Sequence, residues 1–173
     1  MNKYIFVDLD ETLIYTHSLF FNKGVSGYQK ITVAPKEHYN TKVRECSVAF
    51  LEEARKKAKV LMLTVATKDY ALAMNKAFSF GFETEDIYSR EDIRGHTGKT
   101  PQFEPGEVWL FDNLPQEFNE EKCDYLAHLG KLNYVQVSEF DHYSGSSTTL
   151  PDYTVNKPDI SNELLTLLTE KVK

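Results

Sequence analysis

Cysteine is scarce in this sequence, and basic residues are fewer than acidic ones. Cys46 and Cys123 are the only two cysteines among 173 residues, and they form no Cys-x-x-Cys pair. A disulfide framework and a cysteine-rich zinc site are therefore excluded as the basis of the fold, and we expect two reduced thiols. The net charge is −6 at pH 7. This acidity argues against non-specific binding of nucleic acid, which requires a basic surface that neutralises phosphates.

Long apolar runs are also absent from the sequence. No run approaches the length of about 20 apolar residues that a helix needs to cross a bilayer, and the first residues, MNKYIFVD, lack the apolar core of a signal peptide. We therefore expect a cytoplasmic protein without a membrane partner. Hydrophobic residues still make up 41% of the chain. That content suffices for a core, so we expect a single domain over residues 1–173. No feature of the sequence specifies an oligomeric state.

Apolar segments rich in Val, Ile and Leu alternate with segments of helical periodicity. The pattern predicts strands at 3–9, 59–65, 107–112 and 133–137, and helices at 47–58, 68–80, 115–130 and 161–172. Such alternation is typical of an α/β fold with a mainly parallel sheet. We therefore predict a three-layer, Rossmann-like sandwich, in which the first strand is apolar on both faces because it lies in the centre of the sheet.

Two segments interrupt this alternation. Within residues 17–45, glycines and Pro35 separate short β-like runs such as YQKITVA (28–34). We interpret this segment as a β-hairpin, a flap or small cap inserted after the first strand. The second segment, residues 138–158, is polar and rich in turn-forming residues. It is either a plain surface loop or part of the rim of a functional site.

Polar side chains follow three of the predicted strands at the point where each strand ends. Asp8 and Asp10 follow the first strand, Thr64 ends the second, and Asp112 and Asn113 end the third. Because ligands bind beyond the carboxyl ends of parallel strands, we expect these residues to lie together. Carboxylate and amide oxygens are preferred ligands of Mg²⁺, and a carboxylate can attack phosphorus. The pattern indicates Mg²⁺-assisted phosphoryl transfer.

Each of these residues also has an ordinary structural explanation. The two N-terminal aspartates fit a solvated turn at a strand end, Thr64 fits a β-branched strand position, and Asp112 fits an Asx turn or a helix cap. Their occurrence at three strand ends favours a site. Lys99, in HTGKT, is the lysine best placed to bind phosphate, and Lys68, in ATKDY, is the alternative. The ordinary structural explanation of Lys99 is a solvated lysine in a loop.

The motif VDLDETL resembles the first motif of the haloacid dehalogenase superfamily, DxDx(T/V). Thr64 matches the second motif of that superfamily, Lys99 the third and FDNLP the fourth. One branch of that superfamily is similar to this sequence in three features: DLDETL, TKDYA, and a DN pair followed one residue later by proline. This branch contains the phosphatases that act on the C-terminal domain of RNA polymerase II and their small relatives. It also carries a β-hairpin insertion after the first motif, and the resemblance spans residues 3–130.

The resemblance implies a role for each residue of the first motif. Asp8 would be the nucleophile and a Mg²⁺ ligand. Asp10 would be the general acid and base, and would bind the metal through its backbone carbonyl. Thr12 would steady the first loop.

The remaining motifs receive their roles in the same way. Thr64 and Lys99 would bind the phosphate, and Lys99 would also restrain the nucleophile, with Lys68 as its competitor. Asp112 and Asn113 would complete the metal site, one of them through water.

The function that we expect is a Mg²⁺-dependent phosphatase that hydrolyses phosphomonoesters through an aspartyl-phosphate. The resemblance implies phosphoserine or phosphothreonine of a protein as the substrate. One alternative is a phosphatase of nucleotides or nucleic-acid ends, which needs a local basic groove. The dense basic run RKKAK (55–59) lies at the other edge of the sheet. The second alternative is a non-catalytic binding module, although such modules usually lose an aspartate equivalent to Asp8 or Asp10, and both are present.

Overall fold

A five-stranded sheet forms the centre of the molecule in the computed structural model, which describes residues 2–17, 27–141 and 160–173. The strand order is β6-β5-β1-β7-β8. The strands are β1 (Lys3–Val7), β5 (Lys59–Leu63), β6 (Ile87–Tyr88), β7 (Glu107–Asp112) and β8 (Leu132–Gln136). All four pairings are parallel. The chain adds β5 on one side of β1 and β7 on the other, so the topological switch point lies between β1 and β7.

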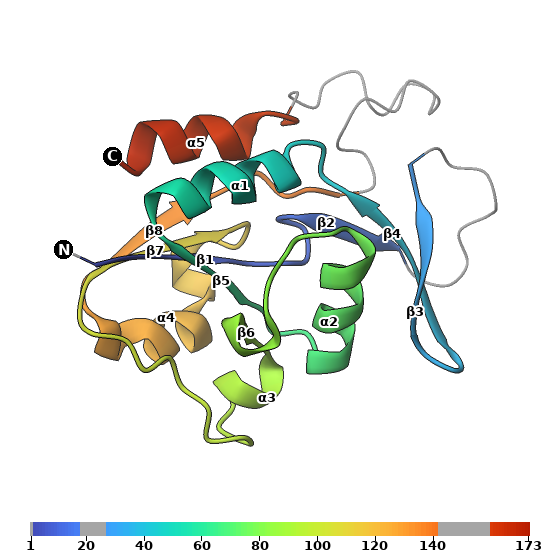
Figure 1. The fold of residues 1–173 in the computed structure, drawn as a ribbon, viewed down its shortest axis with the longest axis horizontal. Helices are drawn as coiled ribbons and strands as arrows, with labels where there is room; N and C mark the ends of the chain where they lie inside the picture. Colours follow the sequence, from blue (N-terminus) through green and yellow to red (C-terminus); the bar gives the residue numbers. More distant parts are fainter. Residues whose placement is uncertain (1, 18–26, 142–159) are drawn as a thin grey trace.

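Helices cover both faces of this sheet (Figure 1). They are α1 (Ser47–Lys57), α2 (Lys68–Ala77), α3 (Arg90–Ile93), α4 (Glu120–Leu126) and α5 (Glu163–Lys171), with 3-10 turns η1 (Thr84–Asp86), η2 (Gln116–Phe118) and η3 (Ala127–Leu129). The figure shows α1 and α5 side by side above the sheet and α3 and α4 below it. The predicted three-layer sandwich with a mainly parallel sheet is confirmed.

The residues of β1 supply both apolar cores, because successive side chains of a strand point to opposite faces. Ile5 and Val7 pack with residues of α1, α2 and α5 on one face. Tyr4 and Phe6 pack with residues of β7 and α4 on the other. All four side chains are buried. Burial on both faces explains why the strand is apolar throughout, as a central parallel strand must be.

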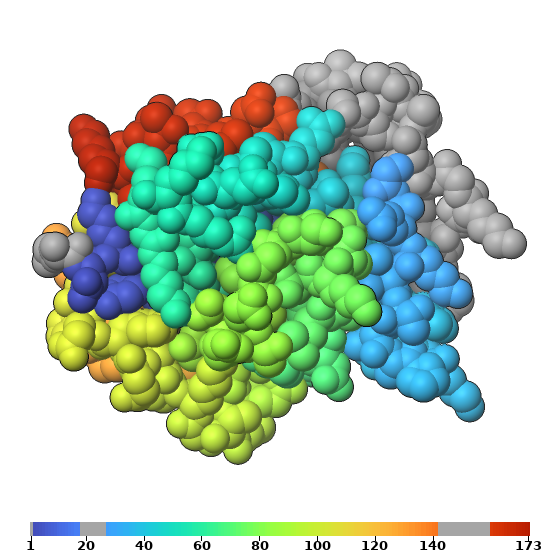
Figure 2. Space-filling model, viewed as in Figure 1, coloured from blue at the N-terminus to red at the C-terminus, as the bar shows by residue number. Residues whose placement is uncertain are grey.

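The insertion after β1 forms a second, antiparallel sheet. Its strands are β2 (Ile14–His17), β4 (Glu37–Val43) and β3 (Gln29–Ala34), in that order. We call these three strands the flap. The flap lies beside α2, and Figure 2 shows its light blue surface next to the green surface of that helix. The expected hairpin insertion is therefore present, although residues 18–26 lie outside the described part of the chain.

Three local features differ from the prediction. The helix expected over 115–130 is divided into η2, α4 and η3. The backbone at Asn119 leaves the helical region with φ −125° and ψ 36°, which separates η2 from α4. The two-residue strand β6 and the four-residue helix α3 were not predicted, since neither is long enough to show a hydrophobic period.

Most of the polar segment 138–158 lies outside the described residues. Within the described ranges, no helix has both the length and the apolar character needed to cross a membrane.

Candidate active site

Two buried carboxylates lie at the switch point of the sheet. Asp8 directly follows β1, and Asp112 is the last residue of β7. The two strands are neighbours, and the backbone N–H of Asp8 donates to the carbonyl oxygen of Phe111 at 2.9 Å. Asp8 is 5% exposed and Asp112 is fully buried. The fold therefore brings the first and fourth sequence motifs together at the edge where ligands of parallel α/β proteins bind.

A lysine that was not among the predicted site residues lies between these carboxylates. Lys122 Nζ, from α4, lies 2.6 Å from Asp8 Oδ1 and 2.6 Å from Asp112 Oδ2. Its side chain is 2% exposed. Burial alone lowers the pKa of Lys122, but the two carboxylates raise it above its ordinary value, so the group stays an ammonium. In the sequence, this lysine follows two glutamates in a helical segment, which is also the pattern of a solvated helix face.

The charges around Asp8 oppose one another. Burial raises the pKa of the Asp8 carboxyl well above its usual range, Lys122 lowers it, and the neighbouring Asp112 raises it further. The single ammonium of Lys122 thus pairs with two buried carboxylates. Such a site retains negative charge, and a cation that enters it is stabilised by that charge.

Lys99 and Lys68 lie elsewhere, which corrects the expectation that Lys99 lies beside the nucleophile. Lys99 Nζ donates to the carbonyl oxygens of Glu85 and Ile87, at 2.8 and 3.0 Å, and lies 4.2 Å from the centre of the Tyr88 ring. Lys68 Nζ also donates to the Ile87 carbonyl. The physical reason is that β6 is an edge strand, whose free carbonyls attract donors. The structure brings Lys122 to Asp8 instead.

Thr12 connects the first motif to the fourth. Its hydroxyl donates to Asp8 Oδ2 at 3.1 Å and accepts a hydrogen bond from the backbone N–H of Asn113 at 3.2 Å. Thr12 is fully buried. Asp112 is held independently, because its Oδ1 accepts from the N–H of Leu114 at 2.9 Å. Each carboxylate therefore has a defined orientation before any ligand binds.

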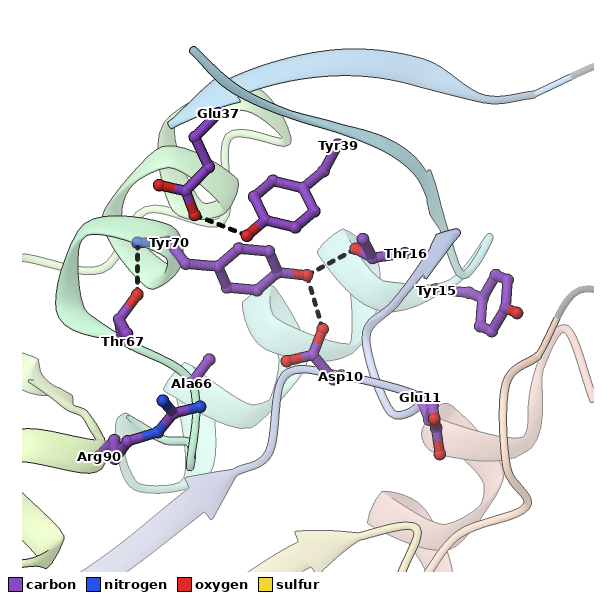
Figure 3. Close-up of a pocket in the computed structure, with 10 residues that line it drawn as sticks. All are labelled: Asp10, Glu11, Tyr15, Thr16, Glu37, Tyr39, Ala66, Thr67, Tyr70 and Arg90. Carbon is purple, nitrogen blue, oxygen red and sulfur yellow. Dashed lines mark hydrogen bonds between the residues drawn. The ribbon is translucent and has the colours of Figure 1, made fainter. Parts of the chain in front are cut away.

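Asp10 lies outside the strand, beside the flap. Tyr70 Oη, from α2, donates to Asp10 Oδ1 at 2.7 Å, and Thr16 Oγ1 of β2 lies 2.5 Å from the same phenol oxygen (Figure 3). Burial raises the pKa of the Asp10 carboxyl, and the hydrogen bond from Tyr70 opposes this rise. The turn after Asp10 places Glu11 in the left-handed region, with φ 63°.

Thr64 directly follows β5, the strand next to β1, and is 1% exposed. Its Oγ1 accepts a hydrogen bond from the backbone N–H of Ala66 at 3.1 Å. This contact keeps the side chain at the carboxyl end of the sheet, on the same edge as Asp8. The predicted position of Thr64 at a strand end is thus observed.

A cavity of about 380 Å³ opens beside Asp10. It lies between the first-motif turn, the flap and the start of α2 (Figure 3). Its lining residues are Asp10, Glu11, Tyr15, Thr16, Glu37, Tyr39, Ala66, Thr67, Tyr70 and Arg90. Three of them carry carboxylates and one carries a guanidinium, so the lining is more acidic than basic.

The oxygen atoms at the switch point have the chemistry that Mg²⁺ requires. Among the described residues, no group of three or more His, Cys, Asp and Glu side chains could hold a metal ion. Mg²⁺, however, usually binds one or two carboxylates and completes its octahedron with water and substrate phosphate. Asp8 and Asp112 share the Lys122 ammonium, and Asn113 Oδ1 lies 3.3 Å from Thr12 Oγ1. Two carboxylates with an amide oxygen nearby fit this hard cation.

Comparisons with known proteins identify the family and the fold. Residues 3–127, most of the chain, match the family of NLI interacting factor-like phosphatases. No curated protein sequence matches the chain significantly. The fold is similar to that of a variant of the fission yeast RNA polymerase II CTD phosphatase Fcp1 bound to beryllium fluoride, with a TM-score of 0.54 and 16% identity over 98% of this chain. It is also similar to the HAD domain of the effector Lem4 from Legionella pneumophila, with a TM-score of 0.51 and 13% identity.

The extent of these matches differs. The alignment covers 99% of this chain and 96% of the Lem4 domain. It covers 51% of the Fcp1 chain, so this protein spans about half the length of that relative. At these identities the likeness establishes the fold, while the family match covers all four sequence motifs.

Proposed function

Because the chain belongs to the NLI interacting factor-like phosphatase family, within the haloacid dehalogenase superfamily, we propose that it is a Mg²⁺-dependent phosphatase that uses Asp8 as its nucleophile. One observation carries the proposal. The Asp8 carboxylate is buried at the switch point between Lys122 and Thr12, with Asp10 two residues further along at the wall of a cavity.

The first step transfers the phosphoryl group to the enzyme. An oxygen of Asp8 attacks phosphorus, the bond from phosphorus to the leaving oxygen breaks, and the Asp10 carboxyl gives its proton to that oxygen. Thr12 orients Asp8 through the hydrogen bond to Oδ2. The products are an aspartyl-phosphate, an alcohol and the ionised carboxylate of Asp10.

The second step releases phosphate and restores the enzyme. The Asp10 carboxylate takes a proton from a water molecule, whose oxygen attacks the phosphorus of the aspartyl-phosphate. The acyl-phosphate bond breaks, inorganic phosphate leaves, and Asp8 is again a carboxylate. Asp10 returns to its protonated state and is ready to serve as the acid in the next cycle.

Two side chains bind the phosphoryl oxygens in this proposal. We assign to Lys122 the phosphate-binding role that was expected of Lys99, because the Lys122 ammonium lies 2.6 Å from Asp8 Oδ1. The Thr64 hydroxyl accepts from Ala66 N–H, which leaves its own proton available for a phosphate oxygen. Donors in such a water-excluded site stabilise the charge of the transition state.

Asp8, Asp112 and Asn113 would hold the metal, together with the backbone carbonyl of Asp10. Bound Mg²⁺ would offset the repulsion between the Asp8 carboxylate and the phosphate dianion. The residual negative charge of the Asp8–Lys122–Asp112 group supports this assignment. The cation would also compensate the two buried carboxylates more fully than one ammonium does.

The acidic cavity supports a phosphorylated protein as the substrate. Glu11 and Glu37 line the cavity beside Asp10, and Arg90 is the one cation of that lining. A polynucleotide would bring further phosphates towards these carboxylates, which repel them. A peptide brings no such charge beyond its phosphate. Phosphoserine or phosphothreonine of a protein therefore fits better than a nucleic-acid end.

The test is Asp8→Asn, which keeps the shape of the side chain and removes its nucleophilic charge. Turnover of p-nitrophenyl phosphate should fall at least about a thousandfold. Acid-quenched wild-type protein should carry one phosphoryl group by mass spectrometry, and the variant none. An unchanged thermal unfolding curve would show that the fold survives. Retained turnover in a folded variant contradicts the mechanism, and a panel of phosphopeptides, nucleotides and phosphorylated oligonucleotides compares the substrates.

A further inference from the structure

The phenol of Tyr70 is buried and directed at the Asp10 carboxylate. Thr67 caps the first turn of α2 by accepting a hydrogen bond from the backbone N–H of Tyr70, so the helix start fixes the ring position. The Tyr70 side chain is 7% exposed. Its Oη lies 2.7 Å from Asp10 Oδ1, although the two residues are 60 positions apart.

The direction of this hydrogen bond follows from chemistry. Asp10 Oδ1 accepts the single proton of Tyr70 both when the carboxyl is ionised and when it carries its own proton on the other oxygen, as the acid of the first step does. Burial and the neighbouring Asp10 charge both raise the pKa of Tyr70, which keeps this proton in place. The phenol oxygen can then accept from Thr16 Oγ1, which lies 2.5 Å away.

The flap extends this arrangement by one more hydroxyl. Thr16 Oγ1 of β2 lies 3.0 Å from Thr41 Oγ1 of β4, and Thr41 is fully buried. If Thr41 donates to Thr16 and Thr16 to Tyr70, three hydroxyls point one way along a chain that ends at Asp10. Such chains strengthen each hydrogen bond in turn.

The Tyr70 ring is also held by packing. The ring of Tyr39 meets it edge-on, with centroids 5.1 Å apart. The Tyr39 hydroxyl is directed elsewhere, since it donates to Glu37 Oε1 at 2.6 Å. Of these two tyrosines of the cavity, Tyr70 contacts Asp10 through its hydroxyl and Tyr39 does not (Figure 3).

We propose that Tyr70 is a positioning residue that holds one oxygen of Asp10, so that the other oxygen is presented to the leaving group. In Figure 3 the second carboxyl oxygen points away from Tyr70, towards the side of Ala66 and Arg90. This inference rests on the proposed function, in which Asp10 protonates the leaving oxygen. Position matters because proton transfer requires hydrogen-bond distance in the transition state.

The leaving group provides a readout that a purely structural role of Tyr70 would not change. An alkoxide such as that of serine is a poor leaving group and needs the proton from Asp10 as the bond breaks. A p-nitrophenolate leaves without one. The parameter kcat/KM reports the steps up to phosphoryl transfer, so later hydrolysis of the aspartyl-phosphate does not obscure it.

The experiment compares Tyr70→Phe with the wild type on a phosphoserine peptide and on p-nitrophenyl phosphate. We expect kcat/KM to fall by about 10- to 100-fold on the peptide, a part of the usual contribution of general acid catalysis, and by less than about threefold on the aryl phosphate. Tyr39→Phe, which loses the hydroxyl that contacts Glu37, should keep the wild-type ratio between the two substrates.

Thr16→Val is a second variant, which removes the contact to the Tyr70 phenol and keeps the ring. It should change the ratio between substrates in the same direction as Tyr70→Phe, and it keeps the proposal testable if Tyr70→Phe does not fold. Equal losses on both substrates, no loss in either, or the same split in Tyr39→Phe would overturn the proposal. These outcomes differ from a failure of the proposed function, because in that case Asp8→Asn would retain turnover.

Discussion

Lys122 Nζ lies 2.6 Å from Asp8 Oδ1, although 114 residues separate them in the chain. The contact depends on α4, which follows β7 and returns its side chain to the switch point next to β1. The same ammonium binds Asp112 at 2.6 Å. Two carboxylates that would repel each other in a dry site are thereby held together.

Replacement of Lys122 by methionine tests which lysine serves the site. Lys122→Met should lower kcat/KM by about 100-fold or more, the usual effect of removing one donor to developing charge. It should also destabilise the fold by about 3–5 kcal/mol, because two buried carboxylates lose their partner. The measurements are aryl-phosphate kinetics and urea unfolding.

Lys99→Met is the matched control for that experiment. It removes a lysine whose Nζ binds backbone carbonyls at the edge strand, and its effect on kcat/KM should stay below about tenfold. Full loss of activity in Lys99→Met, with activity kept in Lys122→Met, would restore the assignment made from the sequence.

Removal of divalent cations should stop the reaction. We expect a chelator to abolish turnover and added Mg²⁺ to restore it. Added Ca²⁺ should not restore turnover, because Ca²⁺ accepts looser and higher coordination. A readout besides activity is thermal stability. Mg²⁺ at about 100 times its dissociation constant should stabilise the wild type by about 2.7 kcal/mol.

Asp112→Asn is the control for metal binding. It keeps the shape of the side chain, lowers the negative charge around Lys122, and should lose most of the stabilisation by Mg²⁺. Equal stabilisation of both proteins would place the cation elsewhere, and turnover that persists after exhaustive chelation would contradict the dependence on a metal.

The sequence predicts those parts of the site that follow from local order along a strand. Asp8 and Asp112 were predicted because each lies at the carboxyl end of an apolar strand, and parallel strands of one sheet share that edge. The predicted strands and the helices predicted at 47–58, 68–80 and 161–172 agree with the structure because each is long enough to show a period, whereas the helix predicted at 115–130 is divided. The flap was predicted from turn-forming residues and short β-like runs.

The missed features depend on tertiary contacts. Lys122 has no local signal, because its position is decided by the break at Asn119 and by the packing of α4 against the sheet. In the sequence, Tyr70 occupies an apolar position of an amphipathic helix. Nothing near it in the sequence indicates a contact with Asp10. Lys99 was preferred for its place in the chain before β7, yet its side chain extends to the edge strand.

The turn between β6 and α3 offers a prediction about how stability depends on pH. Asp92 is 4% exposed, accepts from the backbone N–H of Ser89 at 2.9 Å and accepts from Thr97 Oγ1 at 2.6 Å. Burial alone would raise the pKa of Asp92, but these hydrogen bonds lower it below its ordinary value. A carboxyl with a lowered pKa in the folded state stabilises the fold when it is ionised.

Asp92→Asn should therefore destabilise the protein by about 1–2 kcal/mol near neutral pH, the usual cost of a lost helix cap. The contribution is fully present above the unfolded-state pKa of 3.8 and is lost as the pH falls through the lower folded-state pKa. Urea unfolding of both proteins at about pH 7 and about pH 3 measures this. The difference in unfolding free energy between the wild type and Asp92→Asn should be smaller at the acid pH. A difference that stays constant or widens in acid would mean that the Asp92 charge does not hold this turn.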